Sequence, residues 1–364
     1  MQPDPDRFVW CGHCGLPHEN ELDTCPFTGR LITDARPSLP PQDPFIGQTL
    51  DGKYEVQSLL GKGGMGAVYR ALHVQLHKPV AVKVLLGSGR KTIGRLLREG
   101  RAAANVQHEN VVAVHDVGAL DNETPFLVME LLEGTSLDER LADKGQLPLE
   151  EALEITKQLL AGLEAVHASG VVHRDVKPAN VFLVESGNDS VHVKLLDFSI
   201  SQLSEASRLT ATGEIVGTPA YLSPEQARGE SDLDVRVDIW ATGVVLYEML
   251  AGDYPFPGDS VSALVTKILI DDPEPITELR PDVPNLVQRV ITVALEKERE
   301  DRYDSATAMR LALQRARRRM VDTVVDDGEV MPTIEQGVEP TTLVDDQVER
   351  DELLETQTKP KRRD

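Results

Sequence analysis

Short apolar runs in the first third of the chain are separated by turn residues and predict β-strands. These runs are Tyr54–Leu60, Ala67–Val74 and Pro79–Leu86, and a fourth follows at Phe126–Met129. Because short turns join successive runs, we expect an antiparallel sheet. Between the third and fourth runs, apolar positions recur at helical spacing from Ile93 to Val106, which predicts one helix beside the sheet.

After Met129 the apolar pattern changes mostly to a helical period. Leu149–Ser169 has apolar residues at helical spacing and ends before a glycine. Further helices are predicted at Asp238–Leu250, Ser260–Leu269, Pro284–Leu295 and Ser305–Met320. The sequence therefore predicts an α+β fold in which a small sheet-rich lobe precedes a larger helical lobe.

Composition divides the chain into four sections. Residues 1–36 hold all three cysteines, residues 37–53 form a proline-rich linker, and residues 54–320 carry the regular pattern. Residues 321–364 contain 13 acidic and 5 basic residues and no aromatic residue. We expect this last section to be disordered, because it cannot bury enough apolar surface to offset the entropy of ordering.

The charge of the chain excludes some classes of function. It has 38 Lys and Arg against 60 Asp and Glu, a net charge of −22 at pH 7, which argues against nucleic-acid binding. No apolar run approaches the roughly 18 residues that cross a bilayer, and the first residues lack a signal-peptide pattern. We expect no membrane span, a cytoplasmic location and no disulfide framework.

A glycine-rich segment, GKGGMG at residues 61–66, lies between the first two predicted strands. By itself this pattern also suits an ordinary tight turn. A dinucleotide-binding fold needs a helix after the glycines, whereas a strand follows here, which favours a hairpin that covers phosphates. Lys83 on the next strand can reach the same phosphates if Glu99, on the predicted helix, holds it in an ion pair.

The strongest signal is HRDVKPAN at residues 173–180. Phosphoryl transfer to a hydroxyl needs a carboxylate that accepts the proton, a cation near the transferred phosphate and oxygen ligands for Mg²⁺. Asp175, Lys177 and Asn180 supply these groups within one loop. Asp197, which follows an apolar strand, adds a second carboxylate for the metal.

With these motifs in order, residues 54–320 resemble the eukaryotic-like (Hanks-type) serine/threonine protein kinases, and most of all their bacterial branch. The resemblance includes GTPAYLSPE at residues 217–225, DIWATG at residues 238–243 and the late Arg302. It implies the bilobal protein-kinase fold and transfer of the γ-phosphate of Mg-ATP to proteins. Lys177 and Thr218 resemble serine/threonine enzymes rather than tyrosine kinases.

The resemblance also implies a role for individual residues. Asp175 is the catalytic base and Lys177 stabilises the γ-phosphate, while Lys83, anchored by Glu99, contacts the α- and β-phosphates. Asn180 and Asp197 hold Mg²⁺, and Glu225 forms a buried structural ion pair with Arg302. The implied ATP-binding residues are Leu60, Gly61, Gly63, Gly66, Val68, Ala81, Lys83, Met129, Glu130, Leu132 and Phe182, with Met129 as gatekeeper and the backbone of Glu130 and Leu132 as the hinge.

Two features bear on regulation. Thr210 and Thr212 match the paired activation-loop threonines of bacterial relatives, and Arg174 is placed to receive a phosphate, so we expect autophosphorylation there, with a transient homodimer for transfer in trans. The alternative is that both are ordinary polar loop residues. Ser199 replaces the usual glycine after Asp197-Phe198, which leaves an ATP-binding pseudokinase or scaffold as the alternative function.

The two ends of the chain carry separate hypotheses. Cys11, Cys14 and Cys25 resemble a zinc ribbon, but Thr28 stands where the fourth cysteine is expected, so the alternative is three free thiols. In the tail, Thr323 and Thr342 each precede an aspartate by three residues, a pattern that phosphothreonine-binding modules read. The alternative is that both are incidental in an acidic tail.

Overall fold

A computed structural model describes residues 8–10, 17–19, 24–25, 43–63, 66–85, 106–120, 124–186, 190–197 and 219–326. It separates into one unit ending at Val321 and a second beginning at Asp322. Most of the helix predicted at Ile93–Val106 lies outside the described residues.

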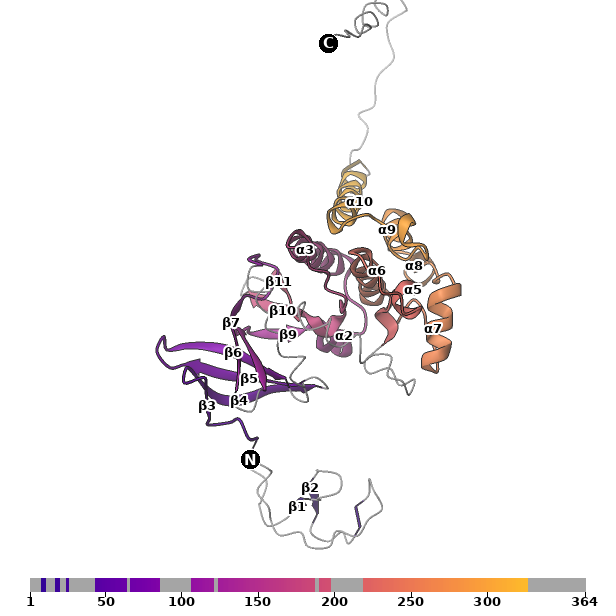
Figure 1. Ribbon diagram of the computed structural model, residues 1–364. Helices are drawn as coiled ribbons and strands as arrows, with labels where there is room; N and C mark the ends of the chain where they lie inside the picture. The colour runs from indigo at the N-terminus through magenta and orange to yellow at the C-terminus, as the bar shows by residue number, and fades with distance from the viewer. Residues whose placement is uncertain are drawn as a thin grey trace, which may run out of the picture. The chain divides into compact units, whose positions relative to one another are not determined.

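The sheet-rich lobe is a six-stranded antiparallel sheet with the order β3-β4-β5-β6-β8-β7 (Figure 1). Its strands are β3 Thr49–Leu50, β4 Tyr54–Gly63, β5 Gly66–His73, β6 Lys78–Leu85, β7 Val114–Ala119 and β8 Pro125–Glu130. The four predicted strands are confirmed. β7 was not predicted, because polar His115 and Asp116 and a glycine interrupt its apolar pattern.

One face of this sheet forms its own core, which contains the alternating residues Tyr69 and Ala71 on β5 and Val80, Val82 and Val84 on β6. Gly118 lies so close to the ring of Phe126 that a Cβ at this position would overlap it.

Residues 43–53, which the sequence predicts as the end of a linker, are part of this lobe. The Phe45 ring packs on the sheet core, 5.7 Å from the Tyr69 ring between centroids. The Tyr69 hydroxyl donates to Asp43, 3.0 Å from each carboxylate oxygen. The Val56 amide donates to the Gln48 carbonyl at 2.9 Å, so the lobe begins at about Asp43 rather than at Tyr54.

Phe45→Ala is expected to lower the free energy of unfolding by about 2 kcal/mol, because it removes an aromatic ring from the edge of the core. Ile46→Ala is the matched control, since the Ile46 side chain is 45 % exposed and its loss should cost less than about 0.5 kcal/mol. Urea unfolding of the two variants measures this difference. Equal stabilities would contradict the boundary at Asp43.

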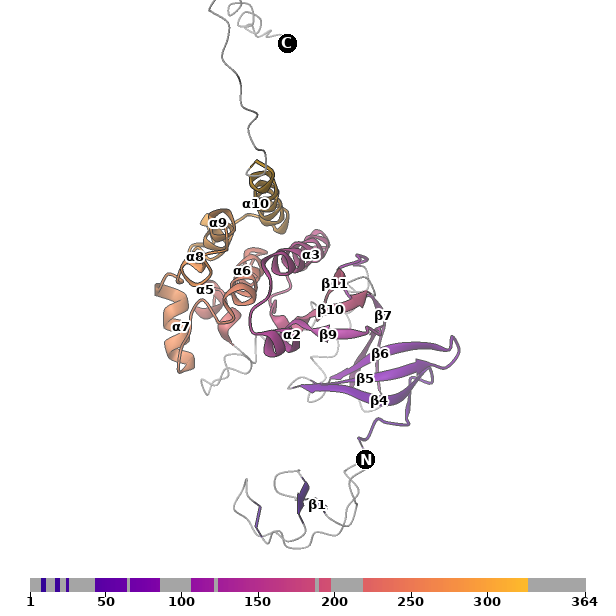
Figure 2. The same cartoon turned by 180° about the vertical axis from the view of Figure 1, so that it is seen from behind.

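The helical lobe contains α2 Leu137–Lys144, α3 Leu149–Ala168, α5 Pro224–Ala227, α6 Arg236–Ala251, α7 Val261–Ile270, α8 Ile276–Leu279, α9 Asn285–Ala294 and α10 Ala306–Asp326 (Figure 2). Short 3₁₀ segments lie at Pro178–Asn180, Pro219–Tyr221 and Arg299–Asp301. The predicted α3, α6, α7 and α9 are confirmed within two residues at each end. α10 continues to Asp326, beyond the predicted end at Met320, and α2 was not predicted. In the described part of the chain, no helix is long and apolar enough to cross a membrane.

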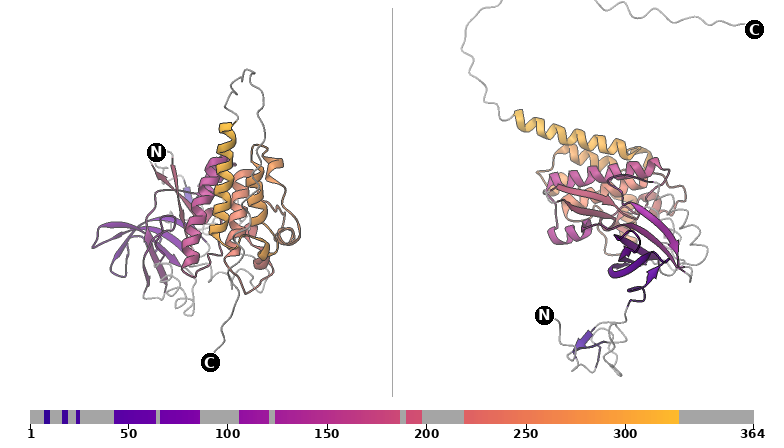
Figure 3. Two further views of the ribbon diagram at one scale, coloured as in Figure 1. Left: turned by 90° about the horizontal axis from the view of Figure 1, so that it is seen from above. Right: turned by 90° about the vertical axis from the view of Figure 1, so that its left-hand side faces the viewer.

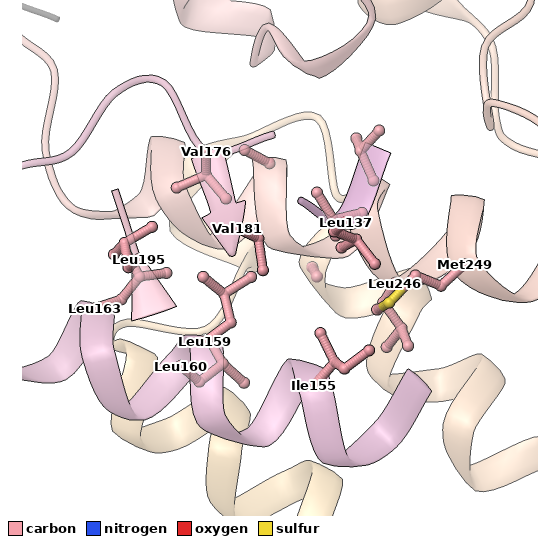
Figure 4. Packing of buried hydrophobic residues seen from close by; sticks show 14 of the residues in the cluster. Leu137, Ile155, Leu159, Leu160, Leu163, Val176, Val181, Leu195, Leu246 and Met249 are labelled. Atoms are coloured by element: carbon pink, nitrogen blue, oxygen red, sulfur yellow. The ribbon is translucent and has the colours of Figure 1, made fainter. Parts of the chain in front are cut away.

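Helix α6 is the centre of this lobe, because nearly all of its residues are buried and both α3 and α9 contact it. Leu159 and Leu163 of α3 point toward Val181 and Leu195, and Ile155 of the same helix lies toward Leu246 (Figure 4). α10 lies alongside α3 (Figure 3), where Arg310 pairs with Glu164 at 2.9 Å and Arg317 pairs with Glu150 at 2.9 Å. This packing gives the neighbouring loops a rigid support.

Two smaller sheets complete the described structure. β9 Gly134–Ser136, β10 Val181–Ser186 and β11 Ser190–Leu195 form an antiparallel sheet with the order β11-β10-β9 against α3. β1 Phe8–Trp10 and β2 Pro17–Glu19 form a separate antiparallel pair. β11 leads directly to Asp197.

Candidate active site

An ion pair joins the two lobes where β6 faces the end of β11. Lys83 lies in the middle of β6, opposite Val68 of β5 and Leu127 of β8, and is 9 % exposed. Its Nζ donates to Oδ2 of Asp197 at 2.6 Å. The predicted lysine and the predicted metal-binding carboxylate are therefore in direct contact. Glu99, the predicted partner of Lys83, lies outside the described residues.

The predicted loop brings its three chemical groups together. Lys177 Nζ lies 3.2 Å and 3.0 Å from the two carboxylate oxygens of Asp175. Asn180 Nδ2 donates to the Asp175 carbonyl at 2.7 Å and to its Oδ2 at 3.1 Å. Lys177 and Asn180 thus orient the Asp175 carboxylate. A carboxylate that accepts a proton from a bound hydroxyl needs such a fixed orientation.

A buried carboxylate on α6 fixes the backbone of this loop. Asp238 is fully buried, and it accepts hydrogen bonds from the amides of His173 at 2.9 Å and Arg174 at 2.7 Å. Arg174 has a φ of +66°, a left-handed conformation that is unfavourable for a residue with a side chain, and the Asp238 contacts hold it there. The sequence analysis includes Asp238 in a motif but predicts no role for it, because its hydrogen-bond partners lie more than sixty positions away in the sequence.

Histidines connect the loop to its surroundings. His173 lies 2.8 Å from the Leu196 carbonyl through Nε2, next to Asp197. His167 of α3 lies 2.8 Å from Asp238 Oδ2 through Nε2. The sequence analysis includes His173 in the motif HRDVKPAN but predicts no role for His173 or His167. Together they tie the loop to α3, α6 and the residue before Asp197.

Asn180 and Asp197 have the chemistry of a Mg²⁺ site. The Leu196 amide donates to the Asn180 carbonyl at 2.8 Å, which brings these two segments together. Asn180 donates through its amide nitrogen, so its side-chain oxygen is the atom that a cation would use. Hard oxygen ligands suit Mg²⁺. Within the described ranges no three His, Cys, Asp or Glu side chains gather into a metal cluster.

The predicted nucleotide wall lies beside these groups. Ala81 of β6 pairs with Met129 of β8, and these two residues and the neighbouring Val68 belong to one apolar cluster. Leu132 packs against the same cluster, while Phe182 on β10 is partly exposed and Leu60 is 52 % exposed. Gly61 and Gly63 of β4 pair with Val68 and Gly66 of β5, so the predicted hairpin is confirmed. A Cβ at Gly66 would overlap the Val84 carbonyl oxygen, which explains this glycine.

Comparison with known proteins decides between the possible uses of such a site. The protein kinase domain family matches residues 54–312. The chain belongs to the protein kinase family. The chain is 40 % identical over 293 residues to serine/threonine-protein kinase pkn3 of Myxococcus xanthus, covering 77 % of this chain and 53 % of that protein.

Two further similarities support the family and the fold. The chain is 39 % identical over 271 residues to serine/threonine-protein kinase PknL of Mycobacterium tuberculosis, covering 74 % of this chain and 66 % of that protein. It is similar to the crystal structure of Rad53 in complex with AMP-PNP, with a TM-score of 0.59 and 26 % identity, over 71 % of this chain and 64 % of the other. The chain spans about half to two thirds of the length of these curated relatives.

The kinase fold also contains the predicted ion pair in the helical lobe. Arg302 donates to Glu225 Oε1 at 2.8 Å and to Oε2 at 2.9 Å, with both side chains almost fully buried. Burial acts to raise the pKa of Glu225, but the hydrogen bonds and charge of Arg302 hold this pKa below its ordinary value. The guanidinium also lies over the Trp240 ring, 5.0 Å from its centroid. The pair thus ties α5 to the segment before α10.

Glu248 on α6 has a pKa in the physiological range. Burial raises the pKa of this carboxyl from 4.5 to about 6, the negative charges of Asp138 and Asp253 act in the same direction, and the hydrogen bond from Tyr221 opposes them. The Tyr221 hydroxyl donates to Glu248 Oε2 at 2.7 Å. Because the pKa is higher in the folded state, ionisation of Glu248 destabilises the kinase.

Relative to the wild type, Glu248→Gln is expected to gain stability as pH rises. The protonated carboxyl stabilises the folded kinase fully below pH 4.5, and this contribution is lost as pH rises through about 6. Glutamine does not titrate. The free energy of unfolding of the variant, relative to that of the wild type, should therefore rise by about 2 kcal/mol between acidic and neutral pH. Guanidinium unfolding of both proteins across this range measures the difference, and a constant difference would contradict the shifted pKa.

The remaining predicted residues lie outside the described part of the chain. They are Glu99, Ser199, Thr210, Thr212, Thr218, Thr342, Cys11 and Cys14. Cys25 is described and is 1 % exposed. β1 ends at Trp10 and β2 begins at Pro17, so the residues between them, which include Cys11 and Cys14, connect two paired strands.

Proposed function

We propose that the chain is a serine/threonine protein kinase that transfers the γ-phosphate of Mg-ATP to hydroxyls of proteins. The observation that carries this proposal is the loop in which Asp175 is held by Lys177 and Asn180. The contact of Lys83 with Asp197 and the curated serine/threonine kinases among the relatives support it.

In this mechanism the residues divide the work by charge. Asp175 accepts the proton of the attacking hydroxyl, and Lys177 stabilises the negative charge that develops on the transferred phosphoryl group. Lys83 binds the α- and β-phosphates. When bound by Asn180 and Asp197, Mg²⁺ would neutralise part of the negative charge on the phosphate oxygens. The wall of Val68, Ala81 and Phe182 takes the adenine ring.

An exogenous acceptor tests the reaction. Purified chain is incubated with γ-labelled ATP, Mg²⁺ and casein, and the labelled casein is hydrolysed for phosphoamino-acid analysis. We expect phosphoserine or phosphothreonine and no phosphotyrosine. Binding of Mg-ADP without any transfer of label would favour the alternative, an ATP-binding pseudokinase or scaffold.

The proposal includes regulation by phosphorylation of Thr210 and Thr212. A phosphate on either residue adds negative charge that an arginine such as Arg174 can pair with. Transfer between two copies in a transient homodimer would place the phosphate there. Replacing both threonines with alanine should then lower the transfer rate to casein, and an unchanged rate would remove this part of the proposal.

The proposal also includes zinc binding by Cys11, Cys14 and Cys25. Its support is the paired strands β1 and β2 on either side of the first two cysteines and the burial of Cys25. Metal analysis of the full chain and of Cys11→Ser tests it. About one zinc per wild-type chain that is lost in the variant is expected, and far less than one in the wild type would contradict it.

A further inference from the structure

A second ion pair joins the two lobes. Lys194 of β11 donates through Nζ to Glu130 Oε1 at 2.8 Å. Their side chains are 14 % and 26 % exposed, so the pair is largely shielded from water. Among the ion pairs formed between described residues, only this one and Lys83–Asp197 connect the sheet lobe to the helical lobe.

The same carboxylate oxygen of Glu130 also holds residues 110–113, the segment that leads into β7. The Ala113 amide donates to Glu130 Oε1 at 2.8 Å, and the Glu130 amide donates to the Ala113 carbonyl at 3.0 Å. Residues 110–113 lead into β7 and also contact the end of β11. There the Val112 amide donates to the Leu195 carbonyl at 3.0 Å, and the Leu195 amide donates to the Asn110 carbonyl at 2.9 Å.

These contacts connect the end of β8 to the strand that leads to Asp197. Glu130 is the last residue of β8, and β8 pairs with β6, which carries Lys83. Lys194 is the third residue before Asp197. Val111, which lies just before β7, forms an isolated parallel bridge with Leu195 of β11; Figures 1 and 2 show the strands from opposite sides. The Lys194–Glu130 pair therefore connects the strands that lead to Lys83 and to Asp197.

We infer that Lys194 is a positioning residue for phosphoryl transfer, acting through Glu130 to set where Asp197 lies relative to Lys83. This inference rests on the proposed function, because Asp197 and Lys83 are the groups assigned to the metal and the phosphates. Removal of the ammonium leaves the Glu130 carboxylate shielded from water without its cation, so the segment of residues 110–113 and β11 must shift to hydrate it. Asp197 would shift with β11.

Lys194→Met, Lys194→Arg and a matched Lys157→Met test the inference. Lys157 also forms an ion pair, with Glu154 at 2.7 Å, but both residues lie on α3. The readouts are the Kd for Mg-ADP by calorimetry, the Mg²⁺ concentration for half-maximal activity, and kcat and KM for ATP. Thermal unfolding of each variant reports whether it remains folded.

We expect Lys194→Met to raise the Kd for Mg-ADP and the half-saturating Mg²⁺ concentration about tenfold. Lys194→Arg should restore both to within about threefold of the wild type, because a guanidinium can still pair with Glu130. Lys157→Met should leave both unchanged. A lysine that only stabilises the fold would lower the active fraction without moving these constants.

Three results would overturn the inference: an unchanged Kd in Lys194→Met, a lack of rescue by Lys194→Arg, or an equal loss in Lys157→Met. Failure of the proposed function is distinguishable, because it would appear as a wild type that binds Mg-ADP but transfers no phosphate. In that case the calorimetric comparison of the variants still decides the role of Lys194 in nucleotide binding.

Discussion

Asp175→Asn is expected to reduce the rate of phosphoryl transfer about 10³-fold while leaving the Kd for Mg-ADP near its wild-type value. Asparagine keeps the size of the side chain and can still accept a hydrogen bond from Lys177, which lies 3.0 Å from Asp175 Oδ2. It cannot accept a proton from the attacking hydroxyl. The loss should therefore fall on kcat, measured as initial rates of label transfer to casein.

The control for this variant is Asp232→Asn, which makes the same change at a carboxylate that is 95 % exposed. Its rate should equal that of the wild type. An Asp175→Asn protein that keeps more than about a tenth of the wild-type rate would show that Asp175 is not the base. A large rise in the Kd for Mg-ADP would show instead that Asp175 mainly supports the nucleotide site.

Arg302→Met is expected to lower the free energy of unfolding by about 3 to 5 kcal/mol, because it leaves the Glu225 carboxylate buried without its partner. The Glu225 side chain is 3 % exposed and accepts two hydrogen bonds from Arg302, at 2.8 Å and 2.9 Å. The variant also loses the donation from Arg302 to the Lys297 carbonyl at 3.0 Å. Urea unfolding measures the loss.

The matched control is Arg299→Met, an arginine three residues earlier whose side chain is 28 % exposed and pairs with exposed Glu300. Solvent screens surface pairs of this kind, so the effect of Arg299→Met on stability should be small. Since the main cost in Arg302→Met is an unpaired buried charge, adding Glu225→Leu should recover part of the stability. Equal effects of the two single arginine variants would contradict this interpretation.

The sequence predicted the elements whose apolar period is unbroken. α3 and α6 were predicted within two residues because their buried residues recur without interruption. β9 was missed because it is only three residues long, GTS, and begins with a glycine. β10, VFLVES, was also missed although its first four residues are apolar. The lobe boundary was placed too late because Phe45 is a lone aromatic in a proline-rich stretch, and nothing local shows that it packs beside Tyr69.

The site was predictable where its groups lie close in sequence. Asp175, Lys177 and Asn180 share one loop, so their chemistry could be inferred from residue types alone. The Asp238 contacts with the amides of the loop and the Lys194–Glu130 pair could not, because each joins residues more than sixty positions apart. Such contacts depend on how α6 and β11 pack, and the packing of segments far apart in the chain cannot be predicted from a single sequence.

Intact-protein mass spectrometry of the wild type and Asp175→Asn during incubation with Mg-ATP tests the central claim most directly. The account predicts that the wild type gains phosphoryl groups in discrete steps, that fragmentation places them on serine or threonine, and that Asp175→Asn gains none over the same period. A wild type that binds Mg-ADP but stays unmodified and leaves casein unlabelled, or equal modification of both proteins, would contradict it.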